Sequence, residues 1–250
     1  MTILALVAMW ICLLIIAVAV IMLLVVYILY RRTSYYQITR LSLFSVWINK
    51  GLYGEYRLYK MLRKYEKLGA RFLFNLYVPT QNGKTTEIDV LMITSKGLIV
   101  FESKNYSGWI YGSEHQSHWV QVLGGGLHKA RFYNPIMQNL SHVKHLKNTV
   151  GMHVPMWSAI VFSNRCTLMD VQTHSSNVTV INRTDVARLV QSIWEHITED
   201  RLDAKELSAI YNTLYPFSQV DEKIKEQHVA NMKAMSDKIH NYRRRKGGRH

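Results

Sequence analysis

Cysteine, proline and acidic side chains are all scarce in this sequence of 250 residues. It has two cysteines and four prolines, and its 17 Asp and Glu stand against 31 Lys and Arg. Cys12 and Cys166 are too few for a disulfide framework, which suits a reducing compartment, and they exclude a metal site built on thiolates. The formal net charge of +14 favours a polyanionic partner, such as nucleic acid or an anionic lipid surface.

Charged side chains and histidine are missing altogether from residues 3–30. As a helix rising ~1.5 Å per residue, this segment would be about 42 Å long, whereas the hydrocarbon core of a bilayer is ~30 Å thick. A cleaved signal peptide would need a basic segment before a shorter apolar run, and no basic residue precedes this one. We therefore expect a transmembrane helix that is retained as an anchor.

Basic residues follow the apolar segment directly, at Arg31, Arg32 and Arg40. Because the basic flank of a spanning helix stays in the cytoplasm, we expect a single-pass protein of the cell inner (plasma) membrane. Its N-terminus would face out and its C-terminal domain would be cytoplasmic. Residues 31–49 would be a juxtamembrane connector whose basic side chains contact anionic lipid, with the possibility of a short interfacial helix.

Helix and strand patterns alternate through the rest of the chain. Apolar residues at helical spacing predict helices, and apolar runs bounded by turn residues predict strands. The expected helices are 50–69, 134–150, 184–198 and 203–214, and the expected strands are 71–78, 87–94, 97–105, 109–112, 118–123, 157–163 and 178–181. This order predicts an α/β fold with a mixed sheet flanked by helices. The charged tail from residue 221 offers little apolar surface for docking.

Two strands that are otherwise apolar carry Asp89 and Glu102. These positions lie symmetrically about Ser95–Lys96, so an even-numbered loop would make them cross-strand neighbours with Cβ atoms ~4.5–5.5 Å apart. Two carboxylates so placed need a cation between them, and their oxygens suit Mg²⁺. A three-residue loop that included Gly97 would shift the register by one and remove this pairing.

Lys104 shares a strand face with Glu102 because side chains alternate along a strand. An ammonium beside a metal and two carboxylates can position a water or hold a phosphate oxygen, as metal-assisted hydrolysis of a phosphodiester requires. The competing interpretation is a structural ion pair at the end of a strand. Glu87 lies on the same face as Asp89 and competes for the metal, whereas His142 and His145 are interpreted as residues of a polar helix face.

Five short motifs occur in a characteristic order: GLYGE at 51–55, EID at 87–89, ESKN at 102–105, GWIYG at 108–112 with Trp119, and NPIMQ at 134–138. Together they resemble the NERD (nuclease-related) domain over residues 50–163. That family is related to the PD-(D/E)xK superfamily, which implies a restriction-endonuclease-like fold. The name-giving proline of that superfamily is replaced here by Ile88.

The resemblance implies a nuclease core that depends on Mg²⁺, with Mn²⁺ as a possible substitute. Asp89 and Glu102 match the metal-binding acids, and Lys104 matches the catalytic lysine. Glu55 matches an acidic residue of the first helix that adds a metal ligand or binds a metal-bound water. Gln138 matches a helix glutamine near such sites.

These features predict a membrane-tethered, Mg²⁺-dependent nuclease that cleaves nucleic acid on the cytoplasmic side, with DNA favoured over RNA. Two alternatives stay open: a catalytically inactive, membrane-anchored nucleic-acid-binding or scaffold protein, and a module that reads a lipid surface. The sequence carries no signal for an oligomeric state. The expected segments are a transmembrane helix at 3–30, the connector at 31–49, the nuclease-like domain at 50–163, an α/β extension completing it at 164–218 and a basic charged tail at 219–250.

Overall fold

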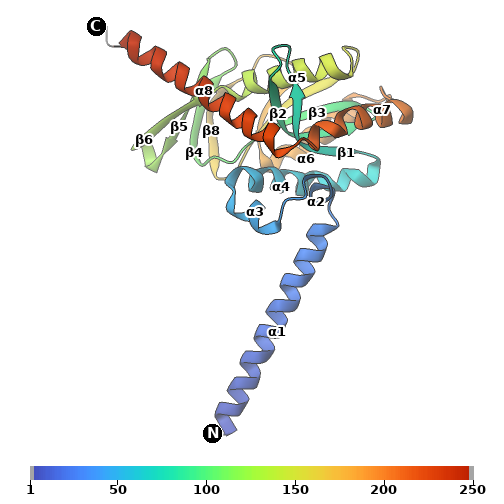
Figure 1. Cartoon of the computed structure of the whole chain (residues 1–250), viewed down its shortest axis with the longest axis vertical. Coiled ribbons are helices and arrows are strands. Elements are labelled where there is room, and N and C mark those ends of the chain that lie inside the picture. Colours follow the sequence, from blue (N-terminus) through green and yellow to red (C-terminus); the bar gives the residue numbers. More distant parts are fainter. Residues whose placement is uncertain (1–2, 248–250) are drawn as a thin grey trace.

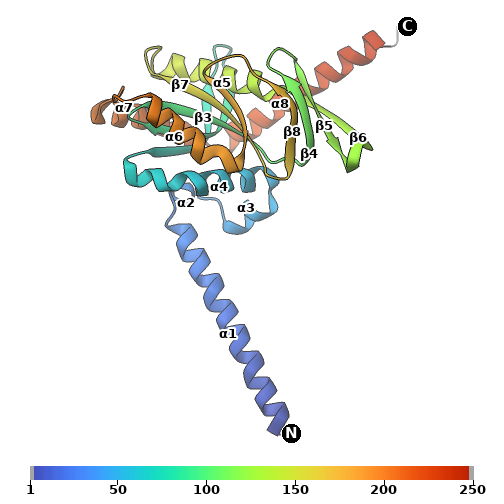
Figure 2. The ribbon, with the colours of Figure 1, turned by 180° about the vertical axis from the view of Figure 1, so that it is seen from behind.

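A long apolar helix projects from a folded α/β body. The computed structural model describes the backbone of residues 3–247 and the side chains of residues 3–234. Helix α1 (Ile3–Arg31) points away from the rest of the molecule (Figures 1 and 2), and its most apolar window has no buried residue. By length and composition, α1 could cross a membrane. The basic side chains at the end of the expected tail lie outside the described residues.

Two short capped helices fill the connector expected at 31–49, where one short interfacial helix was considered, and the expected helix from Lys50 follows them. The three helices are α2 (Ser34–Thr39), α3 (Leu43–Ile48) and α4 (Lys50–Leu62). The side chains of Thr33, Ser42 and Asn49 accept hydrogen bonds from the first backbone N–H groups of these helices, which satisfies donors that have no partner within a helix. Helix α4 is shorter than expected, since residues 63–68 form the 3₁₀ turn η1 (Arg63–Leu68).

The main sheet has five strands in the order β1-β2-β3-β7-β9. They are β1 (Arg71–Pro79), β2 (Thr85–Thr94), β3 (Gly97–Lys104), β7 (Met156–Phe162) and β9 (Val178–Asn182). The pairs β1–β2 and β2–β3 are antiparallel, whereas β3–β7 and β7–β9 are parallel. The expected mixed sheet of an α/β fold is therefore confirmed.

A second sheet of four strands, ordered β6-β5-β4-β8, packs beside the first. The hairpin β4 (Gly108–Ser113) and β5 (His118–Leu123) was expected, but β6 (His128–Tyr133) and β8 (Cys166–Gln172) were not. Both missed strands are mostly exposed, so they lack the apolar run that marks a buried strand. Trp119 of β5 is fully buried and stacks on Phe162 of β7, with ring centroids 6.1 Å apart, which joins the two sheets.

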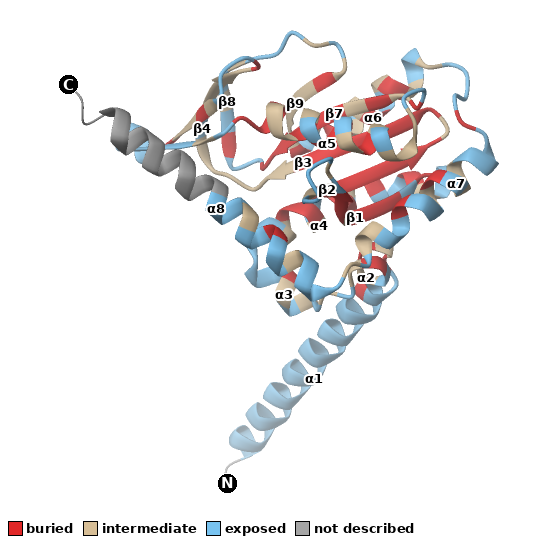
Figure 3. Ribbon diagram, turned by 45° about the horizontal axis from the view of Figure 1, so that its top comes forward, coloured by how far each residue is buried: buried red, intermediate tan, exposed pale blue. Residues whose placement is uncertain are grey.

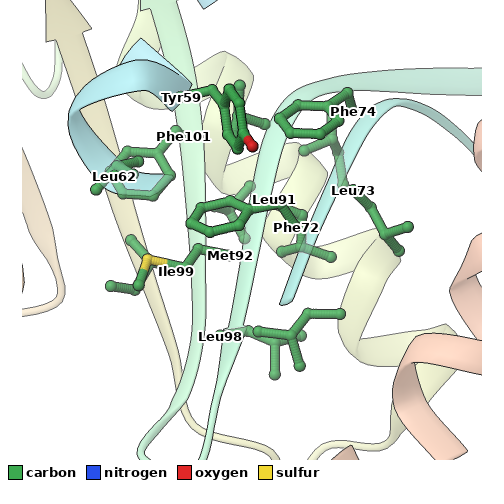
Figure 4. Close-up of a cluster of buried hydrophobic side chains, with 14 of the residues drawn as sticks. Tyr59, Leu62, Phe72, Leu73, Phe74, Leu91, Met92, Leu98, Ile99 and Phe101 are labelled. Atoms are coloured by element: carbon green, nitrogen blue, oxygen red, sulfur yellow. The ribbon is translucent and has the colours of Figure 1, made fainter. Parts of the chain in front are cut away.

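Helices cover both faces of the main sheet (Figures 1 and 2): α5 (Pro135–Val150) on one face, and α4 with α6 (Val186–His196) on the other. Burial is concentrated on the central strands and on the helix faces turned toward them (Figure 3). Figure 4 shows part of this core, where Tyr59 of α4 lies by Phe72 and Phe74 of β1. This packing fixes the positions of β2, β3, α4 and α5 relative to one another.

The C-terminal segment adds η3 (Arg183–Asp185), α7 (Ala204–Leu214), η4 (Tyr215–Ser218) and α8 (Glu222–Gly247), while η2 (Gly124–Gly126) lies between β5 and β6. The tail was expected to offer little apolar surface for docking, yet the first turns of α8 contact the body. His228 is buried, and its ring lies 5.4 Å from that of Tyr77. The tail docks through a histidine and a tyrosine rather than through an apolar stripe.

Candidate active site

The register of β2 and β3 agrees with the even-numbered loop considered from the sequence. Thr94 pairs with Gly97, and the same register continues to Val90 opposite Phe101, so the turn consists of two residues. Continued by one position, this register places Asp89 opposite Glu102. The ladder itself stops there, because Asp89 Oδ2 accepts a hydrogen bond of 2.8 Å from the backbone N–H of Ser103.

Glu102 and Lys104 meet two side chains of α5. Lys104 Nζ donates to Glu102 Oε1 at 2.6 Å and to Gln138 Oε1 at 3.1 Å. His142 Nε2 lies 3.3 Å from Glu102 Oε2, while His142 Nδ1 is 2.7 Å from the hydroxyl of Thr86. Because Gln138 and His142 are one helical turn apart, they reach the end of β3 from the same face of α5.

Glu55 approaches from α4 and meets an amide on β1. Asn75 Nδ2 donates to Glu55 Oε2 at 3.2 Å and lies 3.4 Å from Glu87 Oε1, which also accepts a 2.8 Å bond from the Tyr77 hydroxyl. Asn75 has a φ of 50°, in the left-handed region that an asparagine tolerates better than most residues. Glu87 is thus held by Tyr77 and Asn75.

The carboxylates influence one another strongly. Burial, followed by the charges of Glu87 and Glu102, raises the pKa of Glu55 to about 8. Burial, followed by the charges of Glu102 and Glu55, also raises the pKa of Asp89 well above its usual value. Burial alone would raise the pKa of Glu102 too, but Lys104 and His142 outweigh it and lower this pKa to about 2. Glu102 is therefore ionised, whereas Glu55 and Asp89 resist ionisation.

Comparison with known proteins places these residues in a family. The model of the nuclease-related domain, NERD, matches residues 50–163. An uncharacterized protein of Bacillus anthracis is 34% identical over 180 residues, which span 72% of this chain and 82% of the relative. This chain belongs to the NERD family. The family indicates a nuclease-like function, and no solved structure matched the chain.

The donor set of this NERD domain suits a hard divalent cation, because it consists of carboxylate oxygens. Asn75 Oδ1 is buried without a hydrogen-bond partner, and such an atom is costly unless a ligand or ion satisfies it. Within the described residues, however, no three His, Cys, Asp or Glu side chains form a group that could hold a metal. The chemistry of the donors therefore fits Mg²⁺, and the carboxylates are neighbours without converging on one point.

Sequence reasoning named Glu55, Asp89, Glu102, Lys104 and Gln138, and the structure brings all five into one neighbourhood. It missed two members. His142 is only 5% exposed, so its interpretation as a residue of a polar face is wrong; its spacing of four from Gln138 was the available signal. Asn75 was the other, and its signal was a lone amide within an apolar strand.

Proposed function

We propose that this NERD protein is a membrane-tethered, metal-dependent nuclease that hydrolyses phosphodiester bonds of nucleic acid, with DNA as its preferred substrate. The carrying observation is the combination of two carboxylates with raised pKa values, Glu55 and Asp89, and a lysine held by the ionised Glu102. Burial and mutual repulsion both disfavour the ionised carboxylates, and a bound cation offsets both. A fold without such a role has no need to keep three of them together.

In this proposal Asp89, Glu102 and Glu55 would hold Mg²⁺ or Mn²⁺. The ion, when bound, supplies charge stabilisation to the phosphoryl oxygens and acidifies a water. Lys104 is kept protonated: burial alone would lower its pKa, but Glu102 and Asp89 outweigh it and raise that pKa. Its ammonium, oriented by Glu102 and Gln138, positions a phosphate oxygen or the attacking water. Without the ion, burial and neighbouring carboxylates raise the pKa of Glu55 to about 8, so metal binding at Glu55 should strengthen as pH rises.

Membrane tethering is supported by a second surface beside α1. Helix α3 exposes Phe44 by 70%, Trp47 by 51% and Ile48 by 65%, and α3 lies on the side of the body from which α1 projects (Figures 1 and 2). Exposed aromatic and aliphatic side chains beside a spanning helix suit the interface of a bilayer. We propose that α1 spans the inner membrane with its N-terminus outside and the NERD domain in the cytoplasm.

A second candidate function is an inactive, membrane-anchored scaffold or nucleic-acid-binding protein with a nuclease-like fold. One observation favours it: the described acidic and histidine side chains form no ready-made group for a metal. The two functions differ in whether nucleic acid is cleaved. The division into segments at 31–49, 50–163, 164–218 and 219–250 is part of the same proposal.

The test is cleavage by the full chain reconstituted in lipid nanodiscs. Plasmid DNA, single-stranded DNA and RNA are incubated with Mg²⁺, Mn²⁺ or EDTA. We expect metal-dependent cleavage of DNA that is lost in Asp89→Ala and in Lys104→Ala, and kept in Asp170→Ala and Lys205→Ala, which change exposed residues elsewhere. Cleavage that survives both site variants would come from a contaminant, and DNA binding without any cleavage would favour the scaffold.

A further inference from the structure

Basic side chains gather where the parallel strands of the main sheet end. Arg165 lies just beyond the last residues of β7, and Arg183 directly follows β9. Lys104 is the last residue of β3, which runs parallel to β7. The carboxyl ends of parallel strands lie at the same end of a sheet, so these residues lie at one end of the main sheet. Ligands of α/β sheets bind beyond the carboxyl ends of the strands.

Arg183 is buried without a counter-ion. Its side chain belongs to a residue only 5% exposed, and both Nε and Nη2 lack a hydrogen-bond partner. No acidic side chain forms a salt bridge with it in the part of the chain that the structure describes. A buried guanidinium left in this state destabilises a fold. An anion beside Arg183 would offset this cost.

Two exposed arginines lie beside it. Arg57 Nη1 donates to the Tyr53 hydroxyl at 3.1 Å, and Arg165 Nη2 donates to Asn105 O and Oδ1, both at 3.1 Å. Burial and then the charge of Arg57, with a contribution from Arg165, lower the pKa of Arg183. These residues, Arg57, Arg165 and Arg183, are called the arginine cluster below. Three cations from α4, the β7–β8 turn and η3 therefore repel one another.

The arginine cluster adjoins the candidate active site. Asn105, which receives the hydrogen bonds of Arg165, directly follows Lys104. On the other side, α4 comes so close that a Cβ at Gly54 would lie 3.0 Å from Asn105 Cβ, and Gly54 precedes Glu55. Asn105 and α4 therefore connect the arginine cluster to Lys104 and Glu55.

We propose that the arginine cluster binds a backbone phosphate of the nucleic acid, next to the phosphate that is cleaved. The inference rests on the proposed function and adds a binding site to it. Guanidinium groups suit this ligand because their planar N–H donors match two phosphate oxygens at once. A phosphate there would offset the buried charge of Arg183 and the repulsion among the three arginines.

The first test measures thermal unfolding of the full chain in nanodiscs of neutral lipid, in EDTA, with inorganic phosphate or chloride at equal ionic strength. We expect phosphate to raise the Tm of the wild type. Arg183→Met should be at least as stable as the wild type without phosphate, because it removes an unpaired buried charge, and should not respond to phosphate. An equal response of both proteins to phosphate would overturn the proposal.

The second test measures binding of a labelled DNA duplex in EDTA by fluorescence anisotropy. Arg183→Met and the exposed variant Arg165→Gln should each weaken binding by about tenfold or more, and should reduce the slope of log Kd against log salt by about one. The matched control is Arg71→Gln. Arg71 is exposed and begins β1, so it lies at the opposite end of the strands. Equal binding by all three variants would refute the site.

Two further arms separate this inference from its alternatives. Vesicles containing anionic lipid test a phosphate of the membrane: if Arg165→Gln loses vesicle binding and keeps DNA binding, the nucleic-acid assignment is wrong. Asp89→Ala should bind DNA like the wild type and fail to cleave it. If DNA binding depends on the arginine cluster but the wild type does not cleave, the nuclease proposal is wrong and the phosphate site stands. If the wild type cleaves but DNA binding does not depend on the cluster, the phosphate site is wrong and the nuclease proposal stands.

Discussion

Replacing Glu55 by glutamine should stabilise the protein at alkaline pH. Glu55 is only 7% exposed, and its folded-state pKa is about 8 against an ordinary value of 4.5. Between these two values the folded chain keeps a proton that the unfolded chain has lost. Its contribution to stability is fully present below pH 4.5 and is lost as pH rises through 8.

The size of the effect follows from the same pKa values. A shift of one pKa unit corresponds to about 1.4 kcal/mol, so the window from 4.5 to about 8 is worth roughly 5 kcal/mol. Glu55→Gln carries a neutral amide at every pH and can still accept the hydrogen bond of Asn75. Its advantage over the wild type should therefore grow with pH and reach a few kcal/mol above pH 8, or roughly ten degrees in Tm.

The assay is thermal unfolding of the full chain in nanodiscs between pH 5 and 9, in EDTA and then with Mg²⁺. Glu199→Gln, an exposed carboxylate far from the site, is the control and should follow the wild type. Added Mg²⁺ should restore more stability to the wild type at pH 9 than to Glu55→Gln. Parallel Tm curves of the wild type and Glu55→Gln across this range would refute the reasoning.

Two other substitutions probe the site and the packing behind it. His142→Gln removes the ring that helps to lower the pKa of Glu102. Cleavage should therefore fall about tenfold or more, and should fall furthest at acidic pH, where Glu102 would become protonated. A loss that is constant across the pH–rate profile would contradict this role. Gly112→Ala would drive a Cβ into the ring of Trp119, so urea titration should show a loss of about 1–3 kcal/mol in the free energy of unfolding, and an unchanged midpoint would contradict it.

Periodicity in the sequence predicted most of the fold. Several expected elements appear with boundaries shifted by a few residues: the three strands of the 71–105 region, the helix beginning at Pro135, and the short strands 157–163 and 178–181. The exposed strands β6 and β8 were not predicted, because a strand without an apolar face is recognised only through its partners. The docking of α8 was not predicted for a related reason: a single contact between His228 and Tyr77 produces no periodic pattern in the sequence.

Two features of the sequence predicted the candidate site: the symmetry of Asp89 and Glu102 about the Ser95–Lys96 turn, and the family motifs. That symmetry placed Asp89 opposite Glu102 before the register was known. The unpaired charge of Arg183 was not predictable, because it depends on which strands end at the same edge. Asn75 had a weaker signal, a lone amide within an apolar strand, which indicates neither its positive φ nor its contact with Glu55.

The central claim is that Asp89 and Glu102 together hold a divalent cation, and calorimetric titration of Mn²⁺ into the full chain in nanodiscs tests it most directly. We predict one bound ion per chain in the wild type and in the exposed control Asp170→Asn, with no saturable binding in Asp89→Asn or Glu102→Gln. Saturable binding that persists in both site variants, or that is missing from the wild type, would contradict the account.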